Sequence, residues 1–414
     1  MCTEKRRRDR FHRIGRKGRG GEVVDESEGA NFFDFEGARF GVRIWTWTED
    51  ATPRSRRDPI LGPTPRRGQG GSPSGWRDRD SSRASDRCAR TSGEGRAPSP
   101  FVLLHGFAQS ARSWSRAASA LADGTHASVY ALDLMGHGES DHPDGERFYG
   151  IGFQARAVLA FCELVAQVEG ARPVLVGYSM GGRVALCAAE CVAHGTASDS
   201  RSTERAGGTA PGGCPTERQR TLEAPSSRRA NVPFRALALE SAGLGPADAS
   251  SRDALAKRNA SWAARLREEG VAPFMAYWES LPLFESQKAL DAETRAEVSA
   301  ERLANDANAL ALTFEYAGAQ AMPVRSEAIR ALRVLAEAGV PAAYLAGALD
   351  AKYRAAAESL KAELGRAIDV RIVPNAGHNV HLEQPEAFAA ELLGFVGEPL
   401  TAPSQSARRS SFRA

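Results

Sequence analysis

The 414-residue sequence lacks the features that would assign it to several specialised classes of protein. No uninterrupted apolar run approaches the roughly eighteen residues of a membrane span. The six cysteines show no metal-ligand spacing, and the basic start is not followed by the apolar segment of a secretory signal. The formal net charge of +3 is too small to indicate a nucleic-acid partner. We therefore expect a cytoplasmic protein that acts without a membrane, a nucleic acid or a metal.

Four stretches of the chain lack the periodic apolar residues from which a core is built. They are 1–30, about 50–98, about 196–231 and 399–414. Arginine, glycine, serine and proline dominate the first internal stretch, and such a composition predicts disorder. It would also suit RNA or an acidic partner, but we interpret both internal stretches as solvated insertions into a folded core.

The remaining sequence alternates between strand and helix patterns. Two short aromatic and β-branched runs, "FFDFEG" and "FGVRIWTWT", predict a hairpin. Further on, strands that are apolar throughout, such as "FVLLHGF", "PVLVGYS" and "PAAYLAGALD", alternate with helices. This predicts an α/β fold, a mainly parallel sheet flanked by helices on both faces. A helical stretch over 251–322 has the size of a lid, which leaves 31–250 and 323–398 as the two parts of the core.

The stretch "VLVGYSMGGRVAL" joins a predicted strand to a predicted helix through a tight, glycine-rich turn. Its G-x-S-x-G pattern places Ser179 at the apex of the turn, where the hydroxyl is exposed above the sheet at a helix N-terminus. Preorganised N–H donors would have to stabilise an oxyanion formed there. The candidates are the backbone N–H of Met180, directly after the serine, and that of Phe107, which follows "LLHG".

A serine hydroxyl becomes reactive when a histidine takes its proton and an acid orients that histidine. Asp350 closes the strand "YLAGALD" and His378 follows the last strand, so the chain order is serine, acid, histidine, as in α/β-hydrolase folds. Glu240, at the end of "LALE", is the rival acid. His381 is a second histidine, which we interpret as a helix-start or pocket residue. We predict that Ser179, Asp350 and His378 form a catalytic triad.

Arg183 lies four residues after Ser179 on the predicted helix, so both side chains project from the same face. Arginine binds a carboxylate through two parallel hydrogen bonds. A plain esterase has little use for a guanidinium beside its serine, whereas an enzyme with a carboxylated substrate does. The alternative interpretation is a surface salt bridge.

Together these residues resemble the α/β-hydrolase superfamily, over about 31–398 without the two insertions. A narrower likeness rests on "LLHGFAQSARSW", "LDLMGHGES", "LVGYSMGGRVAL", "AYWESLPLF", "LAGALDAKY" and "AGHNVHLEQP". These motifs are similar to those of the 2-succinyl-6-hydroxy-2,4-cyclohexadiene-1-carboxylate synthases of menaquinone biosynthesis. The chain departs from that family at Ala108 and Gln109, where a small residue and a glycine are usual.

The resemblance implies further substrate-binding residues. The lid would contribute Trp278, Arg302 and Arg258, and Lys257 is the alternative to the last of these. We also predict that Tyr178, which precedes the serine, contacts the substrate.

The resemblance implies a lyase that needs no cofactor. Proton abstraction next to a carbonyl would drive elimination of pyruvate from a carboxylated cyclohexene, which is the small-molecule partner we expect. The main alternative is a serine hydrolase, such as an esterase, a lactonase or a carbon–carbon bond hydrolase. A non-catalytic scaffold or RNA-associated protein is a third reading. The oligomeric state is not predicted.

Overall fold

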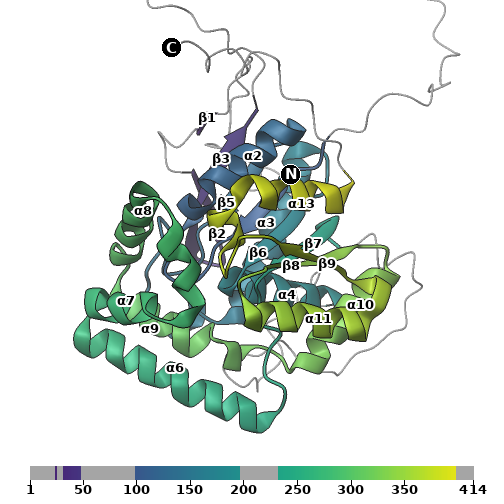
Figure 1. Cartoon of the computed structure of the whole chain (residues 1–414). Helices are drawn as coiled ribbons and strands as arrows, with labels where there is room; N and C mark the ends of the chain where they lie inside the picture. The colour runs from purple at the N-terminus through teal and green to yellow at the C-terminus, as the bar shows by residue number, and fades with distance from the viewer. Residues whose placement is uncertain (1–23, 26–30, 48–97, 196–231, 398–414) are drawn as a thin grey trace, which may run out of the picture.

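The computed structural model of the chain describes residues 24–25, 31–47, 98–195 and 232–397. These residues form one mixed sheet with helices on both faces and a group of helices to one side of it (Figure 1). The fold predicted from the sequence is confirmed. The four stretches predicted to be disordered fall almost entirely outside the described residues.

The sheet contains β-strands in the spatial order β1-β3-β5-β4-β6-β7-β8-β9, with β2 paired to β3. From β5 to β9 all neighbouring strands are parallel, and β1, β2 and β5 are each antiparallel to β3. The strands are β1 (Val24–Asp25), β2 (Asn31–Phe35), β3 (Ala38–Thr46), β4 (Phe101–Leu104), β5 (Val129–Leu132), β6 (Val174–Tyr178), β7 (Ala236–Glu240), β8 (Ala342–Gly347) and β9 (Asp369–Val373).

The predicted hairpin is β2 and β3, joined by a two-residue turn at Glu36 and Gly37. Both turn residues have positive φ, 47° and 87°, as a type I′ turn requires. Strand β1 is the one part of residues 1–30 that the structure describes, and it pairs with β3. A strand of two residues is too short to show an alternating pattern, so it can be recognised only by its pairing with β3.

Helices cover both faces of the parallel strands because successive side chains point to opposite faces. In β4, for example, Val102 and Leu104 pack in one apolar cluster and Phe101 and Leu103 in another. One cluster includes α3 (Ile151–Glu169), α4 (Met180–Ala193), α10 (Arg325–Glu337) and α11 (Ala351–Leu364). The other includes α2 (Ser115–Thr125), α12 (Val380–Glu383) and α13 (Pro385–Val396), and the 3-10 helix η2 (Ala111–Trp114).

Helix α3 is long and apolar enough to cross a membrane by length and composition alone. In its most apolar window, 61% of the helix is buried inside the protein. Because α3 packs against α4 and the sheet, its apolar composition is explained by the core.

The lid runs between β7 and α10 and has an apolar cluster of its own, which includes Phe274, Leu310 and Phe314. Figure 1 shows its helices gathered to one side of the sheet. The Asp248 side chain accepts a hydrogen bond from the Ser251 N–H and so caps the first lid helix. The elements are α6 (Ala249–Glu269), α7 (Val271–Glu279), η5 (Pro282–Ala289), α8 (Ala292–Leu303), α9 (Ala307–Tyr316) and η6 (Ala319–Ala321).

Candidate active site

Ser179 stands at the sharp turn between β6 and α4, with φ of 48°. A turn this tight requires close backbone approaches. A Cβ at Gly177 would lie 2.5 Å from the Gly181 carbonyl oxygen, and one at Gly181 would lie 2.3 Å from that of Leu104. The glycines of the motif are therefore needed for the turn, and the strained serine projects from it.

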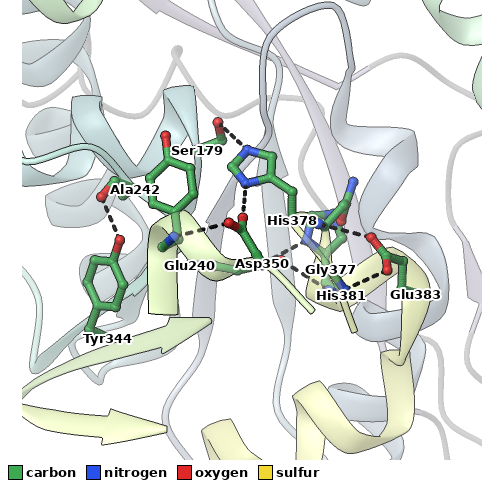
Figure 2. A network of polar contacts seen from close by, with 11 residues as sticks. Ser179, Glu240, Ala242, Tyr344, Asp350, Gly377, His378, His381 and Glu383 are labelled. Atoms are coloured by element: carbon green, nitrogen blue, oxygen red, sulfur yellow. Dashed lines mark hydrogen bonds and ion pairs between the residues drawn. The ribbon is translucent and has the colours of Figure 1, made fainter. Parts of the chain in front are cut away.

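The structure brings Ser179, His378 and Asp350 together from three separate loops (Figure 2). The His378 Nε2 lies 3.1 Å from the Ser179 Oγ, and the Nδ1 of the same ring lies 2.9 Å from the Asp350 Oδ2. The other carboxylate oxygen accepts a hydrogen bond from the Tyr353 N–H at 3.0 Å. In this geometry the histidine can remove the proton of the serine hydroxyl. The serine oxygen can in turn take a proton from a substrate.

The surroundings of the two titratable partners favour a neutral histidine beside an ionised acid. Burial lowers the pKa of His378, and Asp350 opposes this only in part. Burial raises the pKa of Asp350, but hydrogen bonds from His378 and the Tyr353 N–H outweigh it, so that the pKa lies below its usual value. A neutral imidazole at neutral pH is the form that can accept a proton.

The rival acid, Glu240, is bound to the other histidine. Its carboxylate accepts hydrogen bonds from the His381 N–H at 3.1 Å and contacts the His381 Nδ1 at 2.7 Å. Both side chains are fully buried, and neither borders the cavity described below. The backbone oxygen of Glu240 accepts a hydrogen bond from the Ser179 N–H at 2.8 Å, so this residue supports the elbow from behind.

The two predicted oxyanion donors lie on neighbouring segments. Met180 is the first residue of α4, and Phe107 follows the end of β4. The two segments are joined by a hydrogen bond from the Gly181 N–H to the His105 oxygen at 3.0 Å. Both predicted donors therefore belong to backbone that is tied together beside Ser179.

A cavity of about 790 Å³ lies between the lid and the sheet. Ser179, His378 and Asp350 line it, as do all five residues predicted to bind the substrate: Tyr178, Arg183, Arg258, Trp278 and Arg302. One wall is aromatic, since Trp278 packs against Phe107, Trp262 and Phe284. The cavity thus combines an apolar wall with several guanidinium groups.

The guanidinium of the half-buried Arg183 has few partners. Within the described part of the chain, the one hydrogen bond of this group runs from Nη2 to the Ala317 oxygen at 3.4 Å, and the Nε atom is buried without a partner. Burial lowers the pKa of this guanidinium, and the nearby Arg258 adds to the lowering, although Tyr353 opposes it. A cation in this position would be stabilised by an anion in the cavity.

The lid arginines are held differently. Arg258 lies over the Trp262 ring at 4.5 Å and lines the cavity, whereas its neighbour Lys257 does not line it, which favours Arg258 as the predicted lid contact. Arg302 is almost fully buried and is paired with Glu279, N to O at 3.0 Å. Arg302 therefore borders the cavity while already holding a counter-ion.

Tyr353 and Gln109 are among the cavity residues that the sequence analysis did not assign to the site. The ring of Tyr353 lies 4.8 Å from that of His378, and Gln109 borders the cavity while its Oε1 accepts a hydrogen bond from the Gly106 N–H. Tyr353 could have been found from its place in the first turn after the predicted acid. Gln109 could have been found as the departure from the glycine usual there. In the part of the chain that the structure describes, no three acidic, histidine or cysteine side chains gather as a metal site would need.

The sequence model of the alpha/beta hydrolase family matches residues 101–391. The chain belongs to this family. Among curated relatives, it is 30% identical to the 2-succinyl-6-hydroxy-2,4-cyclohexadiene-1-carboxylate synthase of Klebsiella pneumoniae, over 70% of this chain and 90% of the relative. It is 29% identical to the synthase of Serratia proteamaculans, over 74% of this chain and 96% of the relative.

A solved structure of MenH from S. aureus has a similar fold. The TM-score is 0.56 at 24% identity, over 74% of this chain and 96% of that one. At this identity the likeness establishes the fold of the alpha/beta hydrolase enzymes and no more. The roles of the individual cavity residues in this chain stay predictions.

Proposed function

We propose that the chain is a carbon–oxygen lyase of menaquinone biosynthesis. It would eliminate pyruvate from 2-succinyl-5-enolpyruvyl-6-hydroxy-3-cyclohexene-1-carboxylate and release 2-succinyl-6-hydroxy-2,4-cyclohexadiene-1-carboxylate. The similarity to the curated synthases supports this proposal. The cytoplasmic location expected from the sequence belongs to the same proposal.

In the proposed step, His378 takes up a proton through the Ser179 oxygen from the ring carbon next to the succinyl carbonyl. The electron pair of that C–H bond forms an enolate, whose oxygen would be held by the N–H groups of Phe107 and Met180. The enolate electrons return to form a double bond between ring carbons 2 and 3, the existing double bond moves from carbons 3 and 4 to carbons 4 and 5, and the bond from carbon 5 to the enolpyruvyl oxygen breaks. The leaving group departs as the enolate of pyruvate and takes up a proton on its methylene carbon to become pyruvate.

The observation that carries the proposal is the guanidinium of Arg183. It borders the cavity one helical turn from Ser179, and among the described residues no carboxylate pairs with it. The proposed substrate has carboxylates to offer it. A substrate carboxylate there would remove the cost of burying the charge and fix the ring over the serine.

Replacing Arg183 tests this assignment. Arg183→Ala should lower kcat/KM for pyruvate release about 10²-fold, which corresponds to roughly 3 kcal/mol for a charge-assisted contact. Arg183→Lys should recover only part of this, because lysine cannot form the planar fork. Hydrolysis of p-nitrophenyl acetate, which has no carboxylate to bind, should be slow and should not depend on position 183.

The matched control is Arg267→Ala. Arg267, on lid helix α6, pairs with Glu315 and does not line the cavity. Its replacement should leave pyruvate release unchanged. Fast hydrolysis of the ester without detectable pyruvate release would reject the lyase and favour the hydrolase alternative.

A further inference from the structure

The loop that carries one proposed oxyanion donor is conformationally demanding. Residues 106–110 connect β4 to η2, and Ala108 in their middle has φ of 57°, in the left-handed region that side chains other than glycine rarely adopt. The peptide groups of this loop lie outside any strand or helix, so the regular hydrogen bonds of secondary structure do not fix their orientation. The direction of the Phe107 N–H therefore depends on contacts that other parts of the protein make with the loop.

Lid helix α8 and the residues that follow it supply two of those contacts. The Asn305 Nδ2 donates a hydrogen bond to the Ala108 oxygen at 3.1 Å. Glu301, one turn earlier, accepts a hydrogen bond from the Ser110 N–H at 2.9 Å and another from the Ser110 hydroxyl. The middle and the C-terminal end of the loop are thus attached to the lid.

The core holds the next residue of the chain. The Ala111 N–H donates to the Asp133 Oδ1 at 2.6 Å, so two consecutive amides are bound by two carboxylates, one from the lid and one from the core. Burial raises the pKa of Glu301 to about 7 and that of Asp133 to about 6. Asp133 raises the pKa of Glu301 further, and Arg302 opposes this. When it is ionised, a carboxylate that is largely shielded from water lowers the stability of the folded protein. A glutamate with only a surface role would not carry this cost.

The same helix carries Arg302, which borders the cavity. We propose that Glu301 and Asn305 are positioning residues, through which the lid sets the shape of the oxyanion loop. Arg302, which lines the cavity, and the two side chains that hold the loop then belong to one short stretch of the lid, residues 301–305. This inference rests on the part of the proposed function that assigns an oxyanion donor to Phe107, and it is independent of the substrate.

The first test compares variants at Glu301. Glu301→Ala removes the acceptor for Ser110, and we expect kcat to fall at least about tenfold with KM changed much less, because misplacing a catalytic group slows the reaction without weakening binding. Glu301→Gln keeps an acceptor oxygen of the same reach and should restore kcat to within about threefold of the wild type. Asn305→Ala, which removes the donor to Ala108, should also lower kcat and serves if Glu301→Ala does not fold.

The matched control is Glu297→Ala, one turn earlier on α8, whose side chain is exposed. Each variant is assayed for pyruvate release and for hydrolysis of p-nitrophenyl acetate. If the wild type hydrolyses the ester and releases no pyruvate, the lyase proposal fails, while the ratios for the ester still test the loop. If Glu301→Ala and Asn305→Ala both retain the kcat of Glu297→Ala, the positioning role is wrong.

A second readout is the pH dependence of the melting temperature. Folded Glu301 keeps its proton up to about pH 7, whereas unfolded glutamate releases it near 4.5. Its contribution to stability is therefore present below the unfolded value and is lost as the pH rises through about 7. The melting temperature of the wild type minus that of Glu301→Gln should fall between pH 5 and pH 8. A constant difference would contradict the burial that raises the pKa of Glu301.

Discussion

This protein contains two histidine–carboxylate pairs whose histidines, His378 and His381, are three residues apart in the chain. The two pairs differ in their surroundings. In the first, the His378 Nδ1 lies 2.9 Å from Asp350, and in the second, the His381 Nδ1 lies 2.7 Å from Glu240 (Figure 2). The outer nitrogen of His378 faces the Ser179 hydroxyl. That of His381 has no partner within the described residues, and its ring stacks on Trp114 at 3.6 Å.

The pairs have the same chemistry, so the pairing itself does not make a catalytic base. His378 and Asp350 border the cavity, whereas His381 and Glu240 are enclosed between the sheet and η2. A proton acceptor needs a donor at its free nitrogen and a path to the substrate, and only the first pair has both. The support that Glu240 gives to the turn comes from its backbone oxygen, which accepts a hydrogen bond from the Ser179 N–H, and not from its side chain.

The largest expected effect is the loss of activity when the pair beside Ser179 is changed. Ser179→Ala, His378→Ala and Asp350→Ala should each lower kcat at least about 10³-fold if the three act as one unit, and the double variant Ser179→Ala/His378→Ala should be little worse than either single one. Single-turnover assays would measure this. Losses that multiply would show that the residues act independently.

A change in the pair of His381 and Glu240 should lower the stability of the protein and leave its catalysis nearly unchanged. Glu240→Ala leaves His381 buried without its partner, and we expect the free energy of unfolding to fall by about 3 kcal/mol. Urea unfolding followed by circular dichroism measures the loss. The folded protein should keep a kcat within a few-fold of the wild type, and a loss comparable to that of Asp350→Ala would make Glu240 the catalytic acid.

The smallest effect is a shift of the pH profile. Because burial lowers the pKa of His378 and Asp350 only partly offsets this, the acidic limb of kcat/KM should have its midpoint below the usual value of about 6.5. Activity is lost as the pH falls through that midpoint, since the protonated ring accepts no proton. Asp350→Asn removes the opposing charge and should move the limb to still lower pH. A limb at or above 6.5 in the wild type would contradict a buried neutral base.

Much of this site follows from local sequence. The glycines around Ser179 fit only a turn with backbone in close contact, and apolar strands that alternate with helices bring the ends of parallel strands to one edge. Arg183 could be placed near the serine because four residues make about one helical turn. The sequence favoured Asp350 over Glu240 as the partner of His378, but the actual division of the two acids between the two histidines depends on tertiary contacts, because all four residues lie at the same edge of the sheet.

Tertiary structure decided that division. Glu240 is the last residue of β7 and pairs in register with Leu345 of β8, and its side chain meets the buried His381. Asp350 lies three residues beyond the end of β8 and reaches His378 beside the cavity. The attachment of the lid to the oxyanion loop was equally hidden, because Glu301 and Ser110 are 191 residues apart in the chain. The sequence by itself determined the reactive turn, the order of the triad and the parallel sheet, since each depends on neighbours along the chain. Contacts between distant segments depend on how helices pack on the sheet, and no local pattern records them.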